Sequence, residues 1–427
     1  MTIFDELESN VRYYCRHWPA VFTTASGSTL ADEAGKTYTD FFSGAGALSY
    51  GHNHPLLTEV AVNHLRSGRI MHSLDTHTPE KRALLDALHD RVLVPRELDM
   101  VVQFTGPTGA TAVEAALRLA EKVTGRSGVI AYEGGYHGMT AGAASVSASL
   151  DKRHGSNNRK CQFLPYVTRH DDLAQRHLEA ALLAPEAEQL PGALIVEPVQ
   201  GEAGARPFDP RYLGEVRRLC SKYGVIVIAD EVQVGVGRTG PFFSFQDSAL
   251  EPDIVCLSKS LSGFGLPLAV NLIQRDLDQW APGEFTGTFR GNNLAFATAT
   301  AVLQYYWQDE VLEKATICKA QIIEQFLREL ATEIGLPQSA VQGRGLIWAL
   351  NFPNPEIATA IVATAFRLGL IIEACGQGQT RIKLLPSLLI GDGELARGLA
   401  ALAEAIRLVI KDSPFNVLQR GPVELNS

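Results

Sequence analysis

Two charged residues that follow apolar strands constrain this chain more than any other feature. An apolar run at 225–229 leads directly to Asp230, and a second run at 254–257 leads to Ser258 and Lys259. Strands that are apolar throughout belong to sheets covered by helices on both faces, and such sheets bind ligands at the carboxyl ends of their strands. The sequence therefore predicts that an acid and a lysine face the same ligand.

Pyridoxal phosphate is a cofactor that needs such a pair. A lysine binds its aldehyde as a Schiff base, and an acid keeps its ring nitrogen protonated so that the ring can accept electrons. An apolar strand that ends in Asp-Glu also describes the magnesium-binding strand of a P-loop ATPase. That class needs Gly-x4-Gly-Lys-Ser/Thr, and the Gly-Lys-Thr at 35–37 has Leu30 in place of the first glycine. The ATPase interpretation therefore fails on its own motif.

A separate stretch at 104–111 predicts a phosphate site. It reads Phe-Thr-Gly-Pro-Thr-Gly-Ala-Thr and joins an expected strand to a long helix. The backbone N–H groups at Thr108, Gly109 and Ala110, together with the helix dipole, can therefore face an anion. A helix N-cap at Thr108 or Thr111 explains the same residues equally well.

Three other residues are ambiguous when each is taken alone. Tyr136, which precedes His137, could stack on a planar cofactor, although such a tyrosine is more often part of the core. Thr288 could give a hydroxyl to a phosphate or cap the next helix, and Glu202 is a surface acid unless a basic group faces it. Their joint order along one chain is more informative than any single residue.

Length and composition favour a globular protein with more than one domain. The chain has 427 residues, of which 46% are hydrophobic and 20% charged. The net charge of −9 argues against nucleic acid or a membrane surface as a partner, and no apolar run is long enough to span a bilayer. The six cysteines have no metal-ligand spacing, and the first residues lack the features of a signal peptide. We therefore expect reduced thiols, no bound metal and a cytoplasmic location.

The middle of the chain alternates short apolar strands with helical segments, which predicts an α/β fold with a mostly parallel sheet between helices. Residues 1–50 are interpreted as an arm that contains a hairpin, 51–315 as a large domain that binds the cofactor, and 316–427 as a smaller domain. The arm and the C-terminal segment are expected to form one α+β unit. A long helical region at 294–330 is expected to leave the large domain, and the polar stretch at 152–160 to form an exposed loop.

The order of these motifs resembles the class III aminotransferases of pyridoxal-phosphate fold type I over nearly the whole chain. The resemblance is carried by Ile-Ala-Asp-Glu-Val-Gln at 228–233, Gly-Arg-Thr-Gly at 237–240, Pro-Asp-Ile at 252–254 and Ser-Lys at 258–259. It implies that Lys259 is the Schiff-base lysine and that Asp230 pairs with the pyridine nitrogen.

The resemblance also implies further cofactor contacts. Val232 would pack under the ring and Tyr136 over it, while Gln233 would reach the ring hydroxyl. The phosphate-binding turn corresponds to Gly109 and Ala110. Thr288 corresponds to a threonine that the neighbouring subunit contributes, which implies a homodimer or a dimer of dimers.

Within the class, the chain resembles the diaminobutyrate–2-oxoglutarate aminotransferases of ectoine-type biosynthesis. The similar segments are 8–13, 44–48, 50–53, 74–75, 104–109, 258–263 and 287–293. Two arginines of the wider class are replaced, one by Met139 and the other by Lys383, and a lysine at 383 could still pair with Glu202, although without a bidentate fork. Candidate substrate residues are Ser49, Glu202, Phe285, Arg290 and Lys383. Residues that depart from the subfamily pattern are Ser49, Ala110, Thr111 and Phe285.

The implied reaction is a ping-pong transamination between L-2,4-diaminobutyrate and 2-oxoglutarate that forms L-aspartate 4-semialdehyde and L-glutamate. An alternative is another ω-aminotransferase that acts on ornithine, 4-aminobutyrate or a longer diamine, or a related aminomutase in a secondary-metabolite pathway. A non-catalytic protein that binds the same cofactor is a third reading, which the pair Asp230 and Lys259 disfavours.

Overall fold

The computed structural model describes residues 2–148, 160–183 and 190–411. The expected loop at 152–160 therefore lies almost entirely outside the described residues. Among the helices in the described ranges, none combines the length and apolar character needed to cross a bilayer.

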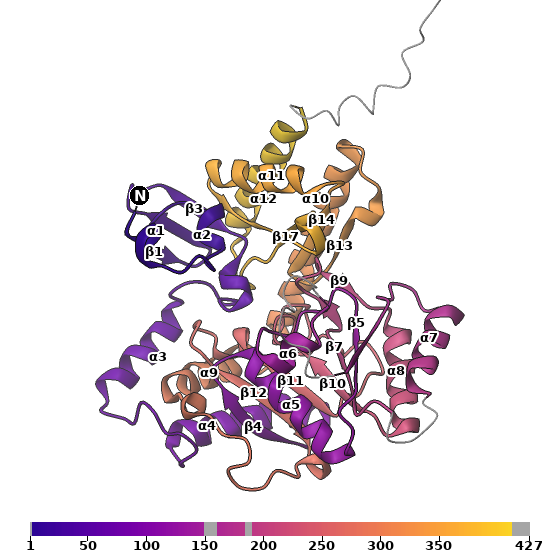
Figure 1. The fold of residues 1–427 in the computed structure, drawn as a ribbon. Helices are drawn as coiled ribbons and strands as arrows, with labels where there is room; N and C mark the ends of the chain where they lie inside the picture. The colour runs from indigo at the N-terminus through magenta and orange to yellow at the C-terminus, as the bar shows by residue number, and fades with distance from the viewer. Residues whose placement is uncertain (1, 149–159, 184–189, 412–427) are drawn as a thin grey trace, which may run out of the picture.

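A seven-stranded sheet forms the centre of the larger lobe (Figure 1). Neighbouring strands run parallel from β11 to β6, whereas β12 is antiparallel to both of its neighbours. The prediction of a mostly parallel sheet is confirmed. In spatial order the strands are β4 (Met100–Gly106), β12 (Ala269–Gln274), β11 (Ile254–Leu257), β10 (Ile226–Asp230), β7 (Ala193–Val196), β5 (Val129–Tyr132) and β6 (Cys161–Leu164).

Helices cover both faces of this sheet because the strands are apolar on both faces. In β10, Ile226 and Ile228 pack in the cluster that contains α5, whereas Val227 and Ala229 pack in the cluster that contains α8. This alternation follows from the two-residue period of a strand. The helices of the larger lobe are α3 (Pro55–Arg66), α4 (Pro79–Leu88), α5 (Gly109–Thr124), α6 (Ala141–Ser145), α7 (Asp172–Leu182), α8 (Pro210–Tyr223) and α9 (Asn293–Tyr306).

The smaller lobe is built from both ends of the chain, as predicted (Figure 1). Its C-terminal part is a sheet covered by helices, and its N-terminal part is a second sheet in which β15 runs parallel to β3. The first sheet contains β13 (Val341–Arg344), β14 (Ile347–Asn351), β17 (Arg381–Leu384) and β16 (Glu373–Cys375), with α10 (Val311–Glu333), α11 (Pro355–Arg367) and α12 (Asp392–Lys411). The second contains β1 (Phe22–Ser26), β2 (Thr29–Asp32), β3 (Thr37–Asp40) and β15 (Leu370–Ile371).

Short elements complete the chain. They are α1 (Ile3–Leu7), α2 (Tyr14–His17) and the two-stranded ribbon of β8 (Val199–Gln200) and β9 (Arg206–Pro207). Along the chain, β8 comes directly before the loop that carries Glu202, and β9 comes directly after it.

The expected helical region at 294–330 is two helices, so that prediction is corrected. The chain breaks between α9 and α10 because the Trp307 ring is buried against Phe242 and its indole N–H donates to the Tyr50 hydroxyl at 3.0 Å. Asp309 then accepts a hydrogen bond from the N–H of Val311 at 3.0 Å and restarts the helix. Helix α9 packs on α3 and α4 of the larger lobe, whereas α10 packs on β13 and β14 of the smaller lobe.

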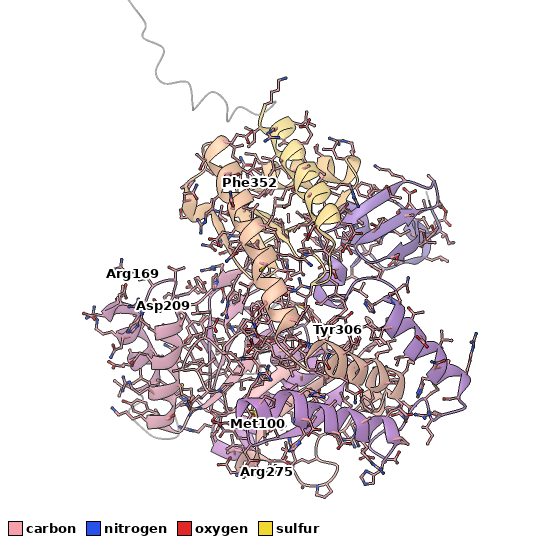
Figure 2. All side chains as sticks on the ribbon, turned by 180° about the vertical axis from the view of Figure 1, so that it is seen from behind. Met100, Arg169, Asp209, Arg275, Tyr306 and Phe352 are labelled. Carbon is pink, nitrogen blue, oxygen red and sulfur yellow. The ribbon has the colours of Figure 1, made fainter. Side chains whose placement is uncertain are left out.

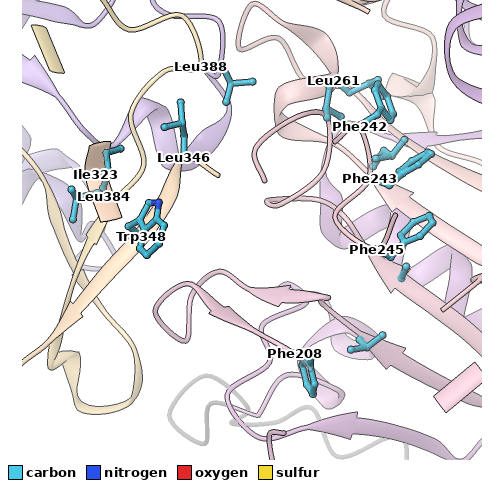
Figure 3. Close-up of a cluster of buried hydrophobic side chains, with 14 of the residues drawn as sticks. Phe208, Phe242, Phe243, Phe245, Leu261, Ile323, Leu346, Trp348, Leu384 and Leu388 are labelled. Carbon is cyan, nitrogen blue, oxygen red and sulfur yellow. The ribbon is translucent and has the colours of Figure 1, made fainter. Parts of the chain in front are cut away.

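Tyr306 lies at the end of α9 (Figure 2). Its hydroxyl lies 2.7 Å from Nε2 of His54, which fixes this end of the helix to the larger lobe. Large apolar side chains from both lobes also belong to one continuous core, among them Phe242 and Phe243 from one lobe and Trp348 and Leu384 from the other (Figure 3). The predicted domain limit at 315 falls inside α10, and the limits themselves stay a prediction.

Candidate active site

Asp230 is the last residue of β10 and is only 3% exposed. One carboxylate oxygen lies 2.7 Å from Nδ1 of His137, and the other accepts the N–H of Val232 at 3.0 Å. Burial disfavours the charged form of His137, but the bond to Asp230 outweighs it and raises the pKa of the imidazole above its usual value. The acid is therefore held in one orientation at the carboxyl edge of the sheet.

Lys259 follows β11, the neighbouring strand, so the predicted pair does share one edge. Its backbone has a φ of +43°, a left-handed conformation that is costly for a side chain with a Cβ. Burial lowers the pKa of its amine, although the nearby Glu202 carboxylate opposes this effect. Within the described residues its Nζ makes no hydrogen bond or ion pair, so the amine is available to a ligand.

The predicted phosphate turn is the start of α5. Thr108 is the N-cap and accepts the N–H of Thr111 at 3.3 Å, so the N-cap interpretation is confirmed and the phosphate site stays a prediction that is compatible with it. The first turn of a helix leaves backbone N–H groups without intrahelical partners, here those of Gly109 and Ala110. A Cβ at Gly109 would lie 2.6 Å from Cγ1 of Val232, which explains the glycine and shows that Val232 lies against this turn.

Glu197 is a site residue that the sequence reasoning missed. It is 6% exposed and follows β7, and its two carboxylate oxygens accept the N–H groups of Tyr136 and Gly201, both at 2.9 Å. Burial raises the pKa of Glu197 to about 7, against the opposing effect of His137. One acid thus fixes the loop of Tyr136 and the loop that leads to Glu202. Its position after an apolar strand, which is also that of Asp230, was the available signal.

Gln233 connects three parts of the site. Its side-chain amide donates to the carbonyl oxygen of Ala45 at 3.2 Å and to Oε1 of Glu202 at 3.1 Å. Its own carbonyl oxygen is buried without a hydrogen-bond partner in the described part of the chain. A buried acceptor of this kind calls for a donor from a ligand.

Glu202 does meet a basic group, namely Lys383. The amine of Lys383 lies 2.8 Å from Oε1 of Glu202 and 2.9 Å from Oε1 of Glu373, and the lysine side chain is fully buried. Burial favours the neutral form of Glu202, but Lys383 and Lys259 outweigh it and lower the pKa of this carboxyl to about 2. Glu373 was not foreseen, because its importance arises only from its position opposite Lys383 on the neighbouring strand.

The remaining predicted residues lie elsewhere in this chain. Ser49 is fully buried, and its hydroxyl is occupied by Ser260 at 2.6 Å and Arg238 at 2.8 Å, so the geometry gives it a structural role. Phe285 packs against Trp280, with ring centroids 5.7 Å apart.

Two predicted residues of the 287–293 segment are also placed. Arg290 forms an ion pair with Asp75 and donates to a backbone carbonyl at 3.2 Å. Thr288 is exposed.

The residues that are brought together fit pyridoxal phosphate. Lys259 offers an unpaired amine, Asp230 a fixed acid, Gln233 an unpaired buried acceptor, and the start of α5 a set of unpaired N–H groups. Val232 fills the space beside Gly109, so only a residue without a Cβ fits at this point of the turn. These are the groups that a planar, phosphorylated aldehyde with a ring nitrogen and a ring hydroxyl requires.

Comparison with known proteins agrees with this site. A family model described as Aminotransferase class-III matches residues 13–406. A protein from Nocardia farcinica named Diaminobutyrate–2-oxoglutarate transaminase is 48% identical over 413 residues, which are 95% of this chain and 94% of that protein. A protein of the same name from Halalkalibacterium halodurans is 44% identical over 419 residues, which are 96% and 97% of the two chains.

Solved structures show the same fold. The ornithine aminotransferase from Toxoplasma gondii ME49 superposes with a TM-score of 0.82 at 25% identity and covers 96% of this chain and 94% of its own. An S-selective transaminase from Arthrobacter sp. has a TM-score of 0.84 at 22% identity, with 96% and 97% covered. The chain therefore belongs to the class III aminotransferases, and its cofactor is pyridoxal phosphate.

Proposed function

We propose that this enzyme interconverts L-2,4-diaminobutyrate and 2-oxoglutarate with L-aspartate 4-semialdehyde and L-glutamate by a ping-pong mechanism. The observation that carries the proposal is the match at 48% and 44% identity, over nearly the full length of both chains, to two transaminases named for this reaction. The pair of Glu202 and Lys383 supports it, because the keto acid has a carboxylate beside its reacting carbon and the diamine has none.

The chain's own residues bind and orient the cofactor. The N–H groups of Gly109 and Ala110 would hold the phosphate, and Gln233 would accept the ring hydroxyl. Tyr136 and Val232 would flank the ring. Asp230, itself held by His137, would keep a proton at the ring nitrogen. When bound, pyridoxal phosphate supplies an aldehyde that takes up the amino group and a ring that accepts electrons.

Lys259 carries the proton transfer. Its lowered amine pKa increases the fraction of neutral amine, which is the form that can remove a proton. In each half-reaction Nζ of Lys259 would move a proton between the amine-bearing carbon of the substrate and the cofactor. The carboxylate of Glu202 lies close enough to act on this amine.

We further propose that the enzyme is a homodimer in which Thr288 of each chain completes the neighbouring site. We also propose that it acts in the cytoplasm and in ectoine-type biosynthesis. The exposed position of Thr288 supports the first point, since its side chain is free to contact a second chain.

The first test is a donor assay with the purified, cofactor-loaded enzyme and 2-oxoglutarate. We expect L-glutamate to form with L-2,4-diaminobutyrate at a kcat/KM at least about tenfold above those with L-ornithine and 4-aminobutyrate, since small differences in a pocket discriminate by about 10–200-fold. Lys259→Ala, as a control for background turnover, should give none. Turnover with ornithine or 4-aminobutyrate but not with diaminobutyrate would instead select another ω-aminotransferase.

A further inference from the structure

Lys383 has two acidic partners that come from different lobes. Glu373 lies directly opposite Lys383 in the antiparallel pair of β16 and β17, so the smaller lobe supplies one partner within its own sheet. Glu202 comes from the loop between β8 and β9 and reaches Lys383 from the larger lobe. The lysine is therefore shared between a fixed acid and an acid on a loop.

The two acids differ in their surroundings. The Glu373 side chain is 5% exposed, whereas that of Glu202 is 23% exposed and also accepts a bond from Gln233. Glu202, Lys383 and Glu373 all influence the pKa of the Lys259 amine, so this cluster lies within electrostatic range of the reacting group. Glu202 is thus the acid that can move into the substrate space.

A substrate carboxylate attached to the reacting carbon must lie near Lys259 and needs a cation there. Lys383 is the neighbouring cation, but Glu202 covers it. When Glu202 withdraws, a lysine without a second acid would be free to follow Glu202 out of position. Glu373 prevents this movement, because it remains 2.9 Å from the amine.

We propose that Glu373 is a specificity-determining positioning residue, which holds Lys383 in its sheet while Glu202 gives way to the α-carboxylate of a 2-oxo acid. This inference rests on the proposed function for the identity of the acceptor. Substrates that react at a terminal carbon, with their carboxylate at the far end, leave the pair of Glu202 and Lys383 closed and do not need Glu373.

The test compares two acceptors on the same enzyme, Glu373→Gln. The cofactor-loaded enzyme is first given an amino group from L-glutamate and then mixed with 2-oxoglutarate or with succinate semialdehyde, whose aldehyde has no neighbouring carboxylate. We expect kcat/KM for 2-oxoglutarate to fall about tenfold or more, because a buried charge pair loses one partner, and that for the aldehyde to change less than about twofold. The ratio does not depend on the fraction of correctly folded enzyme.

Binding gives a second readout without turnover. The dissociation constant of 2-hydroxyglutarate, measured by calorimetry, should rise about tenfold in Glu373→Gln, while that of 4-hydroxybutyrate should not change. Glu80→Gln is the matched control, because Glu80 is also a buried ion-paired acid, 2.8 Å from Arg69 in the larger lobe. Glu80→Gln should leave unchanged both the ratio of kcat/KM for the two acceptors and the ratio of the two dissociation constants.

A double-mutant cycle shows whether Glu373 acts through Lys383. Lys383→Met should itself lower kcat/KM for 2-oxoglutarate, and adding Glu373→Gln to it should lower that value no further. Equal losses for both acceptors, or additive losses in the cycle, would overturn the inference. Because L-glutamate loads the enzyme, failure with diaminobutyrate as donor would refute the proposed function and leave this test intact.

Discussion

Two buried aspartates show how position in the sheet determines the role of a side chain. Asp230 ends β10 and faces His137 at the carboxyl edge. Asp253 precedes β11 at the opposite edge, where it accepts the N–H of Val227 at 2.7 Å and pairs with Arg217 at 2.9 Å. The first acid faces the ligand site and the second joins two strands, although both are at least nine-tenths buried.

Replacement of these two acids by asparagine should therefore have opposite effects. Asp230→Asn should lower kcat by about a hundredfold or more, since a preorganised charge at a reacting group is worth about 10²–10³ in rate. Asp253→Asn should keep kcat but lower the free energy of unfolding by about 1–3 kcal/mol, because a buried partner is lost. Steady-state kinetics and urea denaturation measure the two quantities, and full activity of Asp230→Asn would refute its assigned role.

At this scale the sequence predicted two of the residues that follow apolar strands, missed a third, Glu197, and missed the residues whose role depends on a distant partner. Asp230 and Lys259 could be found because a strand end and a chemical need coincide. Glu373 and Arg238 could not, since the groups they contact are far away in the sequence.

Among the elements, the start of α5 bears most directly on cofactor binding. Gly109 is confined by Val232, whereas Gly214 in the middle of α8 has room, because a Cβ there would lie 3.4 Å from Cβ of Ala249. The same change to alanine should thus distort one helix and strengthen the other.

Gly109→Ala should weaken cofactor binding. The added methyl group would displace Val232 or the turn, and overpacking of this kind costs about 1–3 kcal/mol, which is about tenfold or more in affinity. Titration of the cofactor-free protein with pyridoxal phosphate, followed by absorbance, measures the dissociation constant. Gly214→Ala is the control and should leave that constant unchanged while stabilising the fold by about 0.5–1 kcal/mol. An unchanged constant in Gly109→Ala would exclude the turn as the phosphate site.

Helices and strands were predictable where a local signal marks their ends. The Gly125 and Gly224 caps of α5 and α8 both adopt left-handed conformations. The break after α9 was missed because helical spacing continues across it, and only the burial of Trp307 against the core interrupts the helix.

For the whole molecule, Arg238 is a buried polar connection between the lobes. It is fully buried, and its guanidinium donates to the carbonyl of Leu346 at 2.9 Å, to the hydroxyl of Ser49 at 2.8 Å and to the carbonyl of Pro386. Burial without an acidic partner lowers its pKa to about 9. A planar fork donates from separate nitrogens and reaches acceptors that lie apart, whereas a lysine donates from a single nitrogen.

Arg238→Lys should consequently lower the free energy of unfolding by about 3 kcal/mol, because buried acceptors lose their donors. Arg275→Lys is the matched control, since Arg275 forms an exposed pair with Asp99 at 2.8 Å and such pairs contribute less than about 1 kcal/mol. Urea denaturation of both variants with cofactor bound gives the comparison. Equal stability of the two variants would show that the lobes are held together by apolar packing alone.

The shared oxygen of Glu202 has a consequence for regulation by ligands. Gln233 donates to the arm at Ala45 and to Glu202, while its own side-chain oxygen is buried without a hydrogen-bond partner in the described part of the chain. Any ligand that engages Gln233 therefore changes the free energy with which the arm and the Glu202 loop are held. Binding free energies are reciprocal. If the bound cofactor changes the affinity for a carboxylate that moves Glu202, that carboxylate changes the affinity for the cofactor by the same factor. Substrate and cofactor are in this sense each other's effectors.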